Sequence, residues 1–554
     1  MRILRSFALA CLGLACAHAG QVKITLLATT DLHGNIYPYD YYQAKPVPRG
    51  LAKIATLIAA ARSENPNSLL IDCGDTIQGT PLEYVHQTQV RNGQTERADP
   101  MMLSMNLLGY DAMVLGNHEF NYGLKNLVRA RETAKFPWIS ANTIVARDAA
   151  VKPFEPFLVK TVSGVRVGIV GITTPLIPQW ELAENYRGLR WRAGVEATRE
   201  AVGELKAKHH PDIVIVAGHT GLDRELATGT VRPEDSEENM IYEIALQVHG
   251  IDGIVFGHTH QELPEFRVGD VLLMQPKNWG ISLGRMDFEL DGEPGAWKIT
   301  SKHSRVIPVT PTTQVDERVI ELARAYHDNA EAYLNTPVAN APVEMNGRMA
   351  RVEDTPLLEA IQEVQLFYAK ADISFASIFN THLVIPKGPV TVRQIAALYI
   401  YDNDLYAIEG TGKMVRDALE NAARYFKTGG GLNPRVIGFN YDIAKGVEYE
   451  IDLTQPEGHR ISNLKWHGAA LRDDQKLRLA VNSYRAGGSA GYTMFKGAKI
   501  VWRSPREIRD LMVEYYTERK QLPAKAEGNW RIEPPAAREV LRREAARDTP
   551  DTNQ

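Results

Sequence analysis

The chain has 554 residues, of which 44% are hydrophobic and 23% charged, and its formal net charge is −4. This length predicts more than one domain, and the composition is typical of a folded globular protein. The slightly acidic balance argues against a protein that holds nucleic-acid polymers through a basic face, although a small phosphorylated substrate needs only a local positive site.

The first 19 residues are predicted to be an export signal. Arg2 and Arg5 precede an apolar run over residues 7–16, and Ala17-His18-Ala19 fits a small-x-small cleavage site. The apolar run is too short to span a bilayer comfortably, and no later run is suited to that role. We therefore expect an exported protein without a membrane span, in the periplasm of a bacterium or outside the cell.

The rest of the chain divides by its sequence patterns. Residues 20–312 alternate strand-like apolar runs with helical patterns, which predicts a layered α/β domain. A stretch rich in Pro and Thr then marks a boundary, and helical spacing predicts a linker helix within residues 313–337. A second α+β domain is expected over residues 338–534, followed by a charged tail at residues 535–554.

Five apolar runs of the first domain each end in residues of metal-ligand type. These residues are Asp31 and His33, Asp75, Asn117, His219, and His258 and His260. One histidine after a strand is usually an ordinary surface residue, but the same arrangement five times favours a shared role. Ligands of open α/β sheets bind outside the carboxyl ends of the strands. The pattern therefore predicts one composite site with the Asp, Asn and His inventory of a two-metal hydrolytic centre.

The motifs in this order resemble those of a known family. The series Asp-x-His-Gly, Gly-Asp, Gly-Asn-His-Glu, Gly-His and Gly-His-x-His resembles the calcineurin-like metallophosphoesterases. The segments 30–34, 75–82 and 116–123 are similar to the secreted 5′-nucleotidase family, and within it to the branch that acts on 2′,3′-cyclic nucleotides and 3′-nucleotides. The resemblance implies a β-sandwich flanked by helices in the first domain and an α+β substrate-binding domain in the second.

The resemblance also implies a ligand set for two divalent metal ions. One ion would be held by Asp31, His33, Asp75 and His260, and the other by Asp75, Asn117, His219 and His258, so that Asp75 bridges them. Mixed nitrogen and oxygen ligands suit Mn, Zn, Co or Fe, and the motifs do not choose between these metals.

Two further residues of the first domain receive catalytic roles from the resemblance. His118 would face the phosphate as an electrostatic and general-acid group rather than as a ligand. Many relatives carry an Asp that orients this histidine, and here Asn121 stands in its place. An amide can hydrogen-bond the imidazole, but it cannot stabilise the positive form of the ring by charge.

In the second domain the resemblance implies two aromatic rings that stack on the nucleobase. The matching positions are Tyr441 and Tyr484, with Tyr492 as a substitute for Tyr484, and Asn380 is assigned to substrate binding. A base stacked on an aromatic ring is worth about 1–3 kcal/mol and any base can be accepted. The alternative is that either tyrosine belongs to ordinary core or turn packing.

The expected activity is hydrolysis of 2′,3′-cyclic nucleotides to 3′-nucleotides, and of these to nucleosides and phosphate. The stretch 380–386 lacks the Gly-rich run ending in Ile-Arg that 5′-nucleotidases carry, and the segments 37–42 and 482–486 resemble the cyclic-nucleotide branch. Small nucleotides are thus the expected partners. A 5′-nucleotidase is the alternative within the enzymes, and a catalytically silent nucleotide-binding protein is the alternative outside them.

Overall fold

The computed structural model describes residues 20–224, 230, 237–401 and 403–547. The predicted export signal and the end of the predicted tail lie outside the described residues. The chain forms two compact units. Of the described residues, the first unit contains those up to Tyr39 together with those within Pro46–Tyr326, and the second contains Asp40–Lys45 and those from His327 onward.

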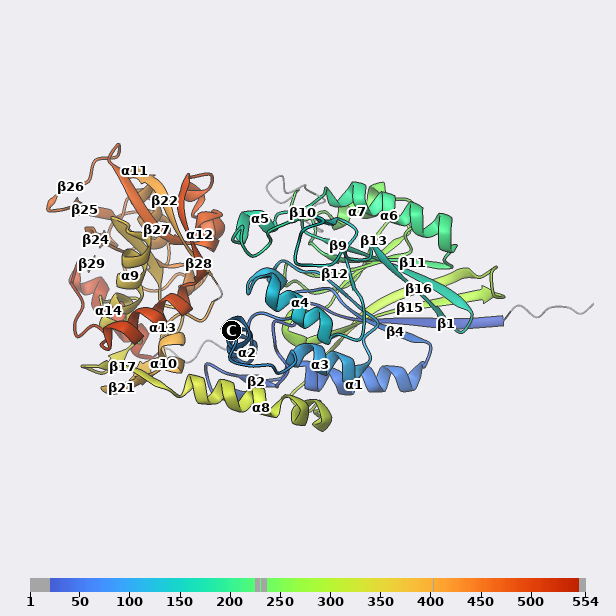
Figure 1. Cartoon of the computed structure of the whole chain (residues 1–554). Coiled ribbons are helices and arrows are strands. Elements are labelled where there is room, and N and C mark those ends of the chain that lie inside the picture. The colour runs from blue at the N-terminus through green and yellow to red at the C-terminus, as the bar shows by residue number, and fades with distance from the viewer. Residues whose placement is uncertain (1–19, 225–229, 231–236, 402, 548–554) are drawn as a thin grey trace, which may run out of the picture. The chain divides into compact units, whose positions relative to one another are not determined.

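The first unit contains a six-stranded sheet in the order β16-β15-β1-β4-β5-β6 (Figure 1). Its parallel strands are β1 (Gly20–Thr29), β4 (Ser68–Asp72), β5 (Ala112–Val114) and β6 (Trp138–Ile139), and the antiparallel strands are β15 (Ser282–Gly292) and β16 (Lys298–Pro308). Because β1, β4 and β5 run in the same direction, their carboxyl ends lie at one edge of the sheet.

A second six-stranded sheet of this unit has the order β13-β14-β12-β11-β9-β8. The strands β9 (Val165–Thr173), β11 (Ile213–His219), β12 (Gly253–Phe256) and β14 (Val271–Gln275) are parallel, and β8 (Phe157–Val162) and β13 (Leu263–Val268) pair antiparallel at the two edges. The near-continuous apolar sequences of β9 and β11 suit strands that are buried on both faces.

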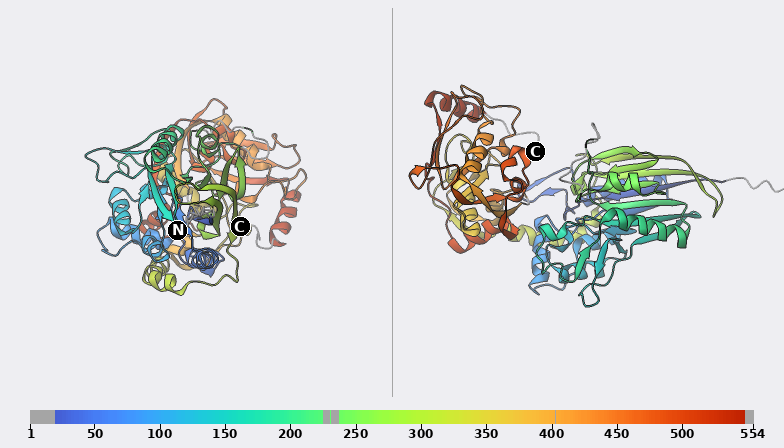
Figure 2. Two further views of the ribbon diagram at one scale, coloured as in Figure 1. Left: turned by 90° about the vertical axis from the view of Figure 1, so that its right-hand side faces the viewer. Right: turned by 90° about the horizontal axis from the view of Figure 1, so that it is seen from above.

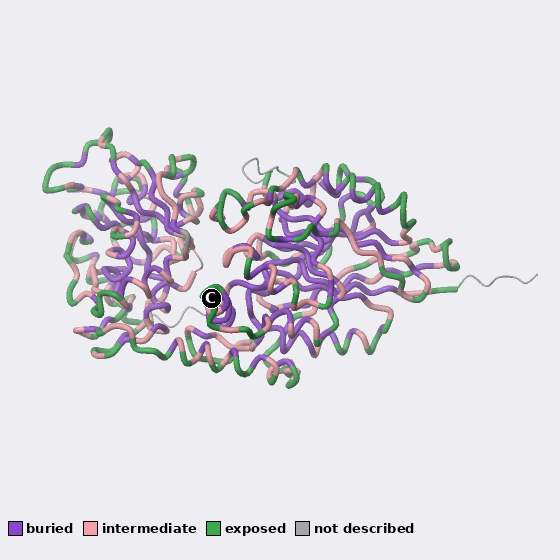
Figure 3. The backbone as a smooth tube through the Cα atoms, in the orientation of Figure 1, coloured by how far each residue is buried: buried purple, intermediate pink, exposed green. Residues whose placement is uncertain are grey.

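The two sheets pack face to face, and helices cover their outer faces (Figures 1 and 2). Between the sheets lies an apolar core that includes Ile71, Ile215 and Phe288. On the outside are α1 (Leu51–Glu64) and α3 (Pro100–Leu108) at one sheet and α6 (Gly194–His209) and α7 (Ile241–Gln247) at the other. The purple tube in Figure 3 follows this buried interior. The predicted layered sandwich flanked by helices is thereby confirmed.

Shorter elements complete the first unit and the connection to the second. They are α2 (Pro81–Arg91), η1 (His118–Phe120), α4 (Leu124–Thr133), α5 (Ile177–Trp180), η2 (Asn278–Gly280), β2 (Tyr39–Asp40), β3 (Lys45–Pro46), β7 (Thr143–Val145) and β10 (Leu189–Trp191). The helix α8 (Glu317–Leu334) lies within the range expected for the linker. Val319 and Ala323 on α8 are fully buried, as their helical spacing predicts.

The second unit is built on a five-stranded mixed sheet in the order β23-β19-β27-β22-β28. Its strands are β19 (Ile373–Ser377), β22 (Asp404–Thr411), β23 (Asp442–Lys445), β27 (Lys476–Asn482) and β28 (Ile500–Glu507). A four-stranded sheet contains β24 (Glu448–Asp452), β25 (Ile461–Trp466), β26 (Ala469–Ala470) and β29 (Trp530–Glu533), and short pairs are formed by β17 (Pro337–Ala341) with β21 (Gly388–Thr391) and β18 (Met345–Asn346) with β20 (Val384–Ile385).

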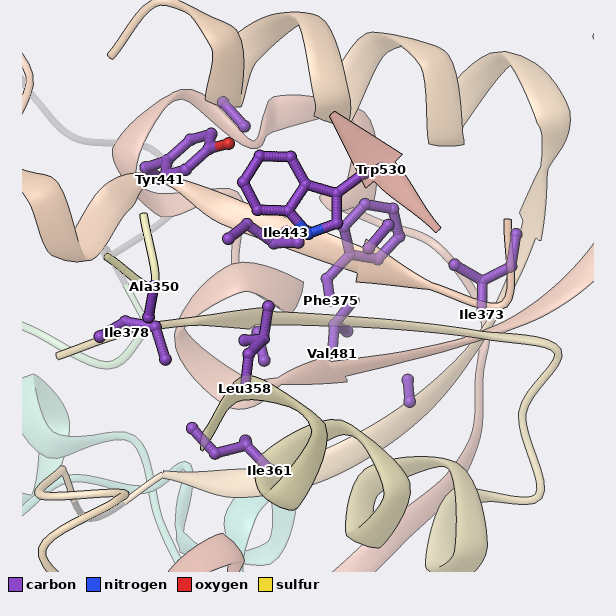
Figure 4. Close-up of a cluster of buried hydrophobic side chains, with 14 of the residues drawn as sticks. Ala350, Leu358, Ile361, Ile373, Phe375, Ile378, Tyr441, Ile443, Val481 and Trp530 are labelled. Atoms are coloured by element: carbon purple, nitrogen blue, oxygen red, sulfur yellow. The ribbon is translucent and has the colours of Figure 1, made fainter. Parts of the chain in front are cut away.

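Helices of the second unit surround an apolar core, of which Figure 4 shows a part. They are α9 (Pro356–Ala369), α10 (Val392–Ala396), α11 (Gly412–Ala423), α12 (Ser483–Ala486), α13 (Ile508–Arg519), α14 (Pro535–Arg547) and the turns η3 (Gly438–Asn440), η4 (Ser489–Gly491) and η5 (Thr493–Phe495). The expected α+β class of this unit is confirmed. No helix within the described residues is long and apolar enough to cross a membrane.

Candidate metal centre

The predicted ligands lie together at the carboxyl ends of five strands of the first unit. They form two clusters, Asp31 with His33 and His260, and Asp75 with His219 and His258, and within each cluster the ligand atoms lie within 4.8 Å of one another. The seventh predicted ligand, Asn117, places its Oδ1 3.1 Å from Nε2 of His219. The structure thus brings all seven side chains into one region.

The distances between the ligand atoms are those expected around bound metal ions. Nε2 of His33 lies 3.1 Å from Nε2 of His260, and Oδ2 of Asp75 lies 3.0 Å from His219 Nε2 and 3.9 Å from His33 Nε2. Ligands that bind one metal ion through bonds of about 2.1 Å lie roughly 3 to 3.5 Å from each other. One carboxylate oxygen of Asp75 therefore faces both clusters, as a bridging ligand must.

The backbone at these ligands is held in an unusual conformation. Five of the predicted ligands have positive φ angles, namely Asp31 (49°), His33 (46°), Asp75 (58°), His258 (76°) and His260 (52°). A left-handed backbone at a residue other than glycine costs free energy and is concentrated at functional sites. The sharp turns that follow the strands point these side chains inward, and the surrounding fold maintains them.

Two glycines of the motifs make room for the site. A Cβ atom on Gly116 would lie 2.2 Å from Oδ1 of Asp75, and one on Gly257 would lie 1.8 Å from the hydroxyl oxygen of Thr30. Both contacts are far shorter than atoms allow, so any side chain would force the ligand turns apart. This close approach explains why a Gly stands before Asn117 and before His258.

Hydrogen bonds on the second ring nitrogen orient the histidines. Nδ1 of His219 lies 2.7 Å from the carbonyl oxygen of Cys73, and Nδ1 of His33 lies 3.1 Å from that of Gln78. A carbonyl oxygen accepts, so both Nδ1 atoms carry the hydrogen and Nε2 presents its lone pair to the cluster. His258 is turned the other way, with Nε2 2.8 Å from the carboxylate of Glu238.

Charges in the site are closely balanced. Burial alone would raise the pKa of Asp31, but its hydrogen bond with His260 and the charges of His219 and His260 lower it to about 2. Burial would lower the pKa of His219, whereas the carboxylate of Asp75 raises it to about 10. These buried carboxylates thus require a positive partner, and a cation can take the place of the proton on His219.

Glu119, which the sequence pattern places next to the ligands, joins two of the ligand turns. Its buried carboxylate accepts backbone N–H groups of Asp75 at 2.9 Å, Thr76 at 2.6 Å and Gly116 at 2.6 Å. The turn after β4 and the turn after β5 are therefore held by the same side chain. Glu119 has a positioning role and does not point its oxygens at the clusters.

His118 lies beside the clusters and contacts them through its backbone and its ring. Its N–H donates to Oδ1 of Asp75 at 2.8 Å, and its ring centre lies 5.3 Å from that of His33. Nδ1 of His118 lies 2.6 Å from Oδ1 of Asn121. The predicted pair of His118 and Asn121 is thus in contact, and Asn121 in turn donates to Glu181, a residue that the sequence analysis does not identify.

The aromatic residues assigned to the base differ sharply in exposure. Tyr484 is 46% exposed, whereas Tyr441 is 1% exposed and lies in the core (Figure 4). The ring of Tyr441 stacks on that of Tyr425, with the ring centres 5.2 Å apart. Tyr492 is also fully buried, with its hydroxyl donating to the carbonyl of Asn440. Burial on all sides leaves Tyr441 no face for a base, so its position indicates core packing.

The neighbourhood of Tyr484 contains another aromatic residue that is not fully buried, Phe439. Arg485 connects the two, because its guanidinium lies 5.3 Å from the Tyr484 ring and donates to the carbonyl of Phe439 at 2.9 Å. Arg485 is itself fixed by a buried ion pair with Asp442 at 2.7 Å. Asn380, the other assigned residue, accepts the N–H of His382 through its side chain.

Comparison with known proteins identifies the class. Residues 24–262 match the calcineurin-like phosphoesterases, and residues 337–497 match the 5′-nucleotidase C-terminal domain. The chain therefore belongs to the calcineurin-like phosphoesterases that carry a 5′-nucleotidase C-terminal domain. It is a metallophosphoesterase, and enzymes of this class use two divalent metal ions, in agreement with the two ligand clusters.

Individual relatives cover most of the chain. A 2′,3′-cyclic-nucleotide 2′-phosphodiesterase/3′-nucleotidase of Salmonella typhimurium is 30% identical over 95% of this chain and 91% of its own length. The trifunctional nucleotide phosphoesterase YfkN of Bacillus subtilis is 30% identical over 93% of this chain, which spans only 39% of that protein. The solved structure of a proposed 5′-nucleotidase from Staphylococcus aureus matches 92% of this chain and 100% of its own, with 26% identity and a TM-score of 0.72.

Proposed function

We propose that this protein hydrolyses 2′,3′-cyclic nucleotides to 3′-nucleotides and 3′-nucleotides to nucleosides and phosphate. The observation that carries the proposal is the pair of ligand clusters that share Asp75, with His118 in contact with that same carboxylate. A relative that is 30% identical and covered almost completely by this chain is named for both reactions. The chemistry of a dinuclear phosphoesterase fits the donor set at each position.

The residues of the site have two different roles in the proposed reaction, metal binding and proton transfer. Asp31, His33, Asp75 and His260 would hold one divalent ion, and Asp75, Asn117, His219 and His258 the other. Bound together, such ions polarise a phosphoryl oxygen and lower the pKa of a water molecule. His118 lies beside the clusters, and a protonated imidazole there stabilises negative charge on the phosphate and gives a proton to the oxygen of the leaving group.

We assign substrate binding in the second unit to two rings that are not fully buried. Tyr484 offers a partly exposed ring for a nucleobase. Phe439 is half-buried and its backbone carbonyl accepts from Arg485, next to Tyr484 in the chain, so it takes the place of Tyr441 as the proposed second stacking residue. Asn380 stays a candidate contact to the substrate. Because any base can stack on an aromatic ring, we expect little selectivity among bases.

The alternative is a 5′-nucleotidase, which is supported by a relative of that name in Vibrio cholerae that is 26% identical over 85% of this chain. A side-by-side assay of 5′-AMP, 3′-AMP and 2′,3′-cyclic AMP separates the two. The proposal requires that the last two are hydrolysed faster than 5′-AMP. Rates for both that fall below the rate for 5′-AMP would establish the 5′-nucleotidase. No turnover of any of the three with metal bound would favour the silent nucleotide-binding protein.

The proposed compartment is the periplasm or the exterior of the cell. It is supported by the sequence pattern of residues 1–19, which predicts cleavage before Gly20. Sequencing of the amino terminus of protein recovered from the periplasm tests this proposal, since an intact Met1 would contradict it. The metal ions are proposed to be Mn, Zn, Co or Fe, to be identified by elemental analysis.

A further inference from the structure

The hydrogen bonds of His118 continue beyond Asn121 to a carboxylate. Nδ1 of His118 lies 2.6 Å from Oδ1 of Asn121, and Nδ2 of Asn121 donates to Oε2 of Glu181 at 2.8 Å. We propose that Glu181 is a positioning residue for the reaction, which fixes the amide of Asn121 and through it the orientation and tautomer of His118. This inference rests on the proposed role of His118.

The contacts of Glu181 show that it acts as an acceptor. Its Oε1 accepts the N–H of Leu182 at 2.6 Å and the side-chain N–H of Asn185 at 2.8 Å, while Oε2 accepts from Asn121. All three partners are donors, which is the set that an ionised carboxylate accepts, whereas an amide group would turn its own NH₂ donor toward at least one of them. Burial raises the pKa of Glu181, and the hydrogen bonds from Asn185 and Leu182 oppose that rise.

An acceptor at this position determines how the Asn121 amide is turned. If the amide were rotated by 180°, its oxygen would face the carboxylate of Glu181 at a distance near 2.8 Å, and two oxygens without a hydrogen between them repel each other. The NH₂ group therefore points to Glu181 and the oxygen to His118. Because that oxygen can only accept, Nδ1 of His118 carries a hydrogen, and proton transfer to a leaving group falls to Nε2.

The arrangement also supplies the charge that Asn121 lacks. Where an aspartate would contact the imidazole directly, here a neutral amide does so and the negative charge lies one side chain further away, on Glu181. The attraction between this charge and the positive ring is weaker at the longer distance, but it acts in a partly buried place where screening by water is reduced. Glu181 thus combines orientation with electrostatic support.

An exchange of the two side chains tests this inference. The single variant Glu181→Gln has no ionised acceptor for Asn121, whereas the double variant Asn121→Asp with Glu181→Gln places the carboxylate next to His118 and the amide behind it. Glu184→Gln, an exposed carboxylate of the same loop, is the matched control. Each protein is assayed with its fastest nucleotide substrate and with p-nitrophenyl phosphate, whose phenolate leaves without a proton.

We expect Glu181→Gln to lower kcat for the nucleotide by roughly 10- to 100-fold, because a positioned acid contributes about 10²–10⁴-fold and only its orientation is lost. Turnover of p-nitrophenyl phosphate, metal content and Tm should change little, as should every property of Glu184→Gln. The double variant should return the nucleotide kcat to within about threefold of the parent. A purely structural role for Glu181 would lower both substrates equally, and the exchange would not rescue it.

Two outcomes would overturn the inference. One is a Glu181→Gln variant with parental kcat on nucleotides, and the other is a double variant that folds and binds metal but stays as slow as Glu181→Gln or slower. If Glu181→Gln fails to fold, the double variant decides alone.

His118→Ala separates this inference from the proposal on which it rests. A fully active, metal-loaded His118→Ala enzyme would refute the role of His118 itself, whereas a slow one with no effect at Glu181 would refute only the role of Glu181.

Discussion

The Nε2 atoms of His33 and His260 lie 3.1 Å apart, although 227 residues separate them in the chain. His33 follows a strand of one sheet, and His260 follows a strand of the other. Two imidazole nitrogens with their lone pairs directed at one point repel each other unless a cation lies between them. A cation held by His33 and His260 would therefore join the carboxyl edges of the two sheets and would stabilise the fold as well as supply the chemistry.

Asp75→Ala is expected to be the most damaging change among the ligands. Oδ2 of Asp75 faces both clusters, so its loss weakens both metal sites at the same time. Turnover should fall on the order of 10³-fold or more, since both the polarising charge and the activated water are lost. Elemental analysis should show much less of both metals. Asp287→Asn, on β15, serves as a control, and two retained ions with normal turnover in Asp75→Ala would refute the bridging role.

His118→Ala is expected to keep its metals and to lose rate. The side chain contacts Asn121 and the His33 ring, and it belongs to neither ligand cluster. Loss of one general acid typically costs about 10²–10⁴-fold in kcat. Metal content by elemental analysis and kcat for 3′-AMP should be measured on the same preparation. Unchanged kcat would assign His118 to structure alone.

Removal of the metals with a chelator is expected to destabilise the first unit selectively. The carboxylates of Asp31 and Asp75 are almost completely buried, and without cations the positive charge that favours their ionised form comes from nearby histidines. Ligands that bind only the folded state stabilise it by mass action. Calorimetry should show one transition moving to lower temperature while another, from the second unit, stays in place. Add-back of Mn, Zn, Co or Fe in turn identifies the ion that restores both stability and activity.

Tyr484→Ala and Tyr441→Ala are expected to fail in different ways. The Tyr484 ring is about half exposed, so its removal should leave Tm unchanged and raise KM for nucleotides roughly 5- to 150-fold, which corresponds to the loss of one stacked base. The Tyr441 ring is buried, so its removal should cost about 3–5 kcal/mol of stability. Hydrolysis of p-nitrophenyl phosphate should be normal in Tyr484→Ala. A raised KM for that base-free substrate would contradict stacking.

Asp99→Asn is expected to change how stability depends on pH. Burial raises the pKa of Asp99 to about 6 from 3.8, and its carboxyl also caps α3 by accepting the N–H of Met102. A carboxyl whose pKa is higher in the folded state than in the unfolded state gives its full stabilisation at pH values below the pKa of the unfolded state. This stabilisation is lost as the pH rises through the pKa of the folded state, which is about 6 for Asp99. Asparagine retains the capping oxygen but does not titrate.

The measurement is the difference in unfolding free energy between Asp99→Asn and the parent, both free of metal, in urea at several pH values. Between pH 4 and pH 7 the parent should lose up to about 3 kcal/mol of unfolding free energy relative to the variant. This figure follows from a pKa change of roughly two units between the unfolded and the folded state. Asp99→Asn also loses the hydrogen bond from Gln87, but this loss lowers the stability of the variant equally at every pH and so does not change the pH dependence. A difference that stays the same at all pH values would show that Asp99 does not titrate in this range.

The sequence could indicate which residues gather at the candidate metal centre because each of them follows a strand, and the strand itself is visible as an apolar run. Glu181 could not be found in this way. It belongs to a loop 60 residues after Asn121, and no local pattern marks its contact with the amide. Tyr441 illustrates a second difficulty. It lies between η3 and β23 and faces the core, whereas Phe439, two residues earlier in the 3₁₀ turn, is partly exposed, and the sequence does not say which ring turns outward.

The left-handed turns that carry Asp31, His33, Asp75, His258 and His260 cost backbone free energy that the chain must meet before any metal binds. Glycine at any of these positions would relieve the backbone, and at Asp31, His33 and Asp75 it would also remove a buried polar side chain, so selection for the stability of the metal-free chain alone would favour loss of the ligands. A scaffold that had become a mere binder of nucleotides would be expected to have relaxed in this way. This chain keeps the complete ligand set in spite of its backbone cost, and selection for catalytic turnover explains why.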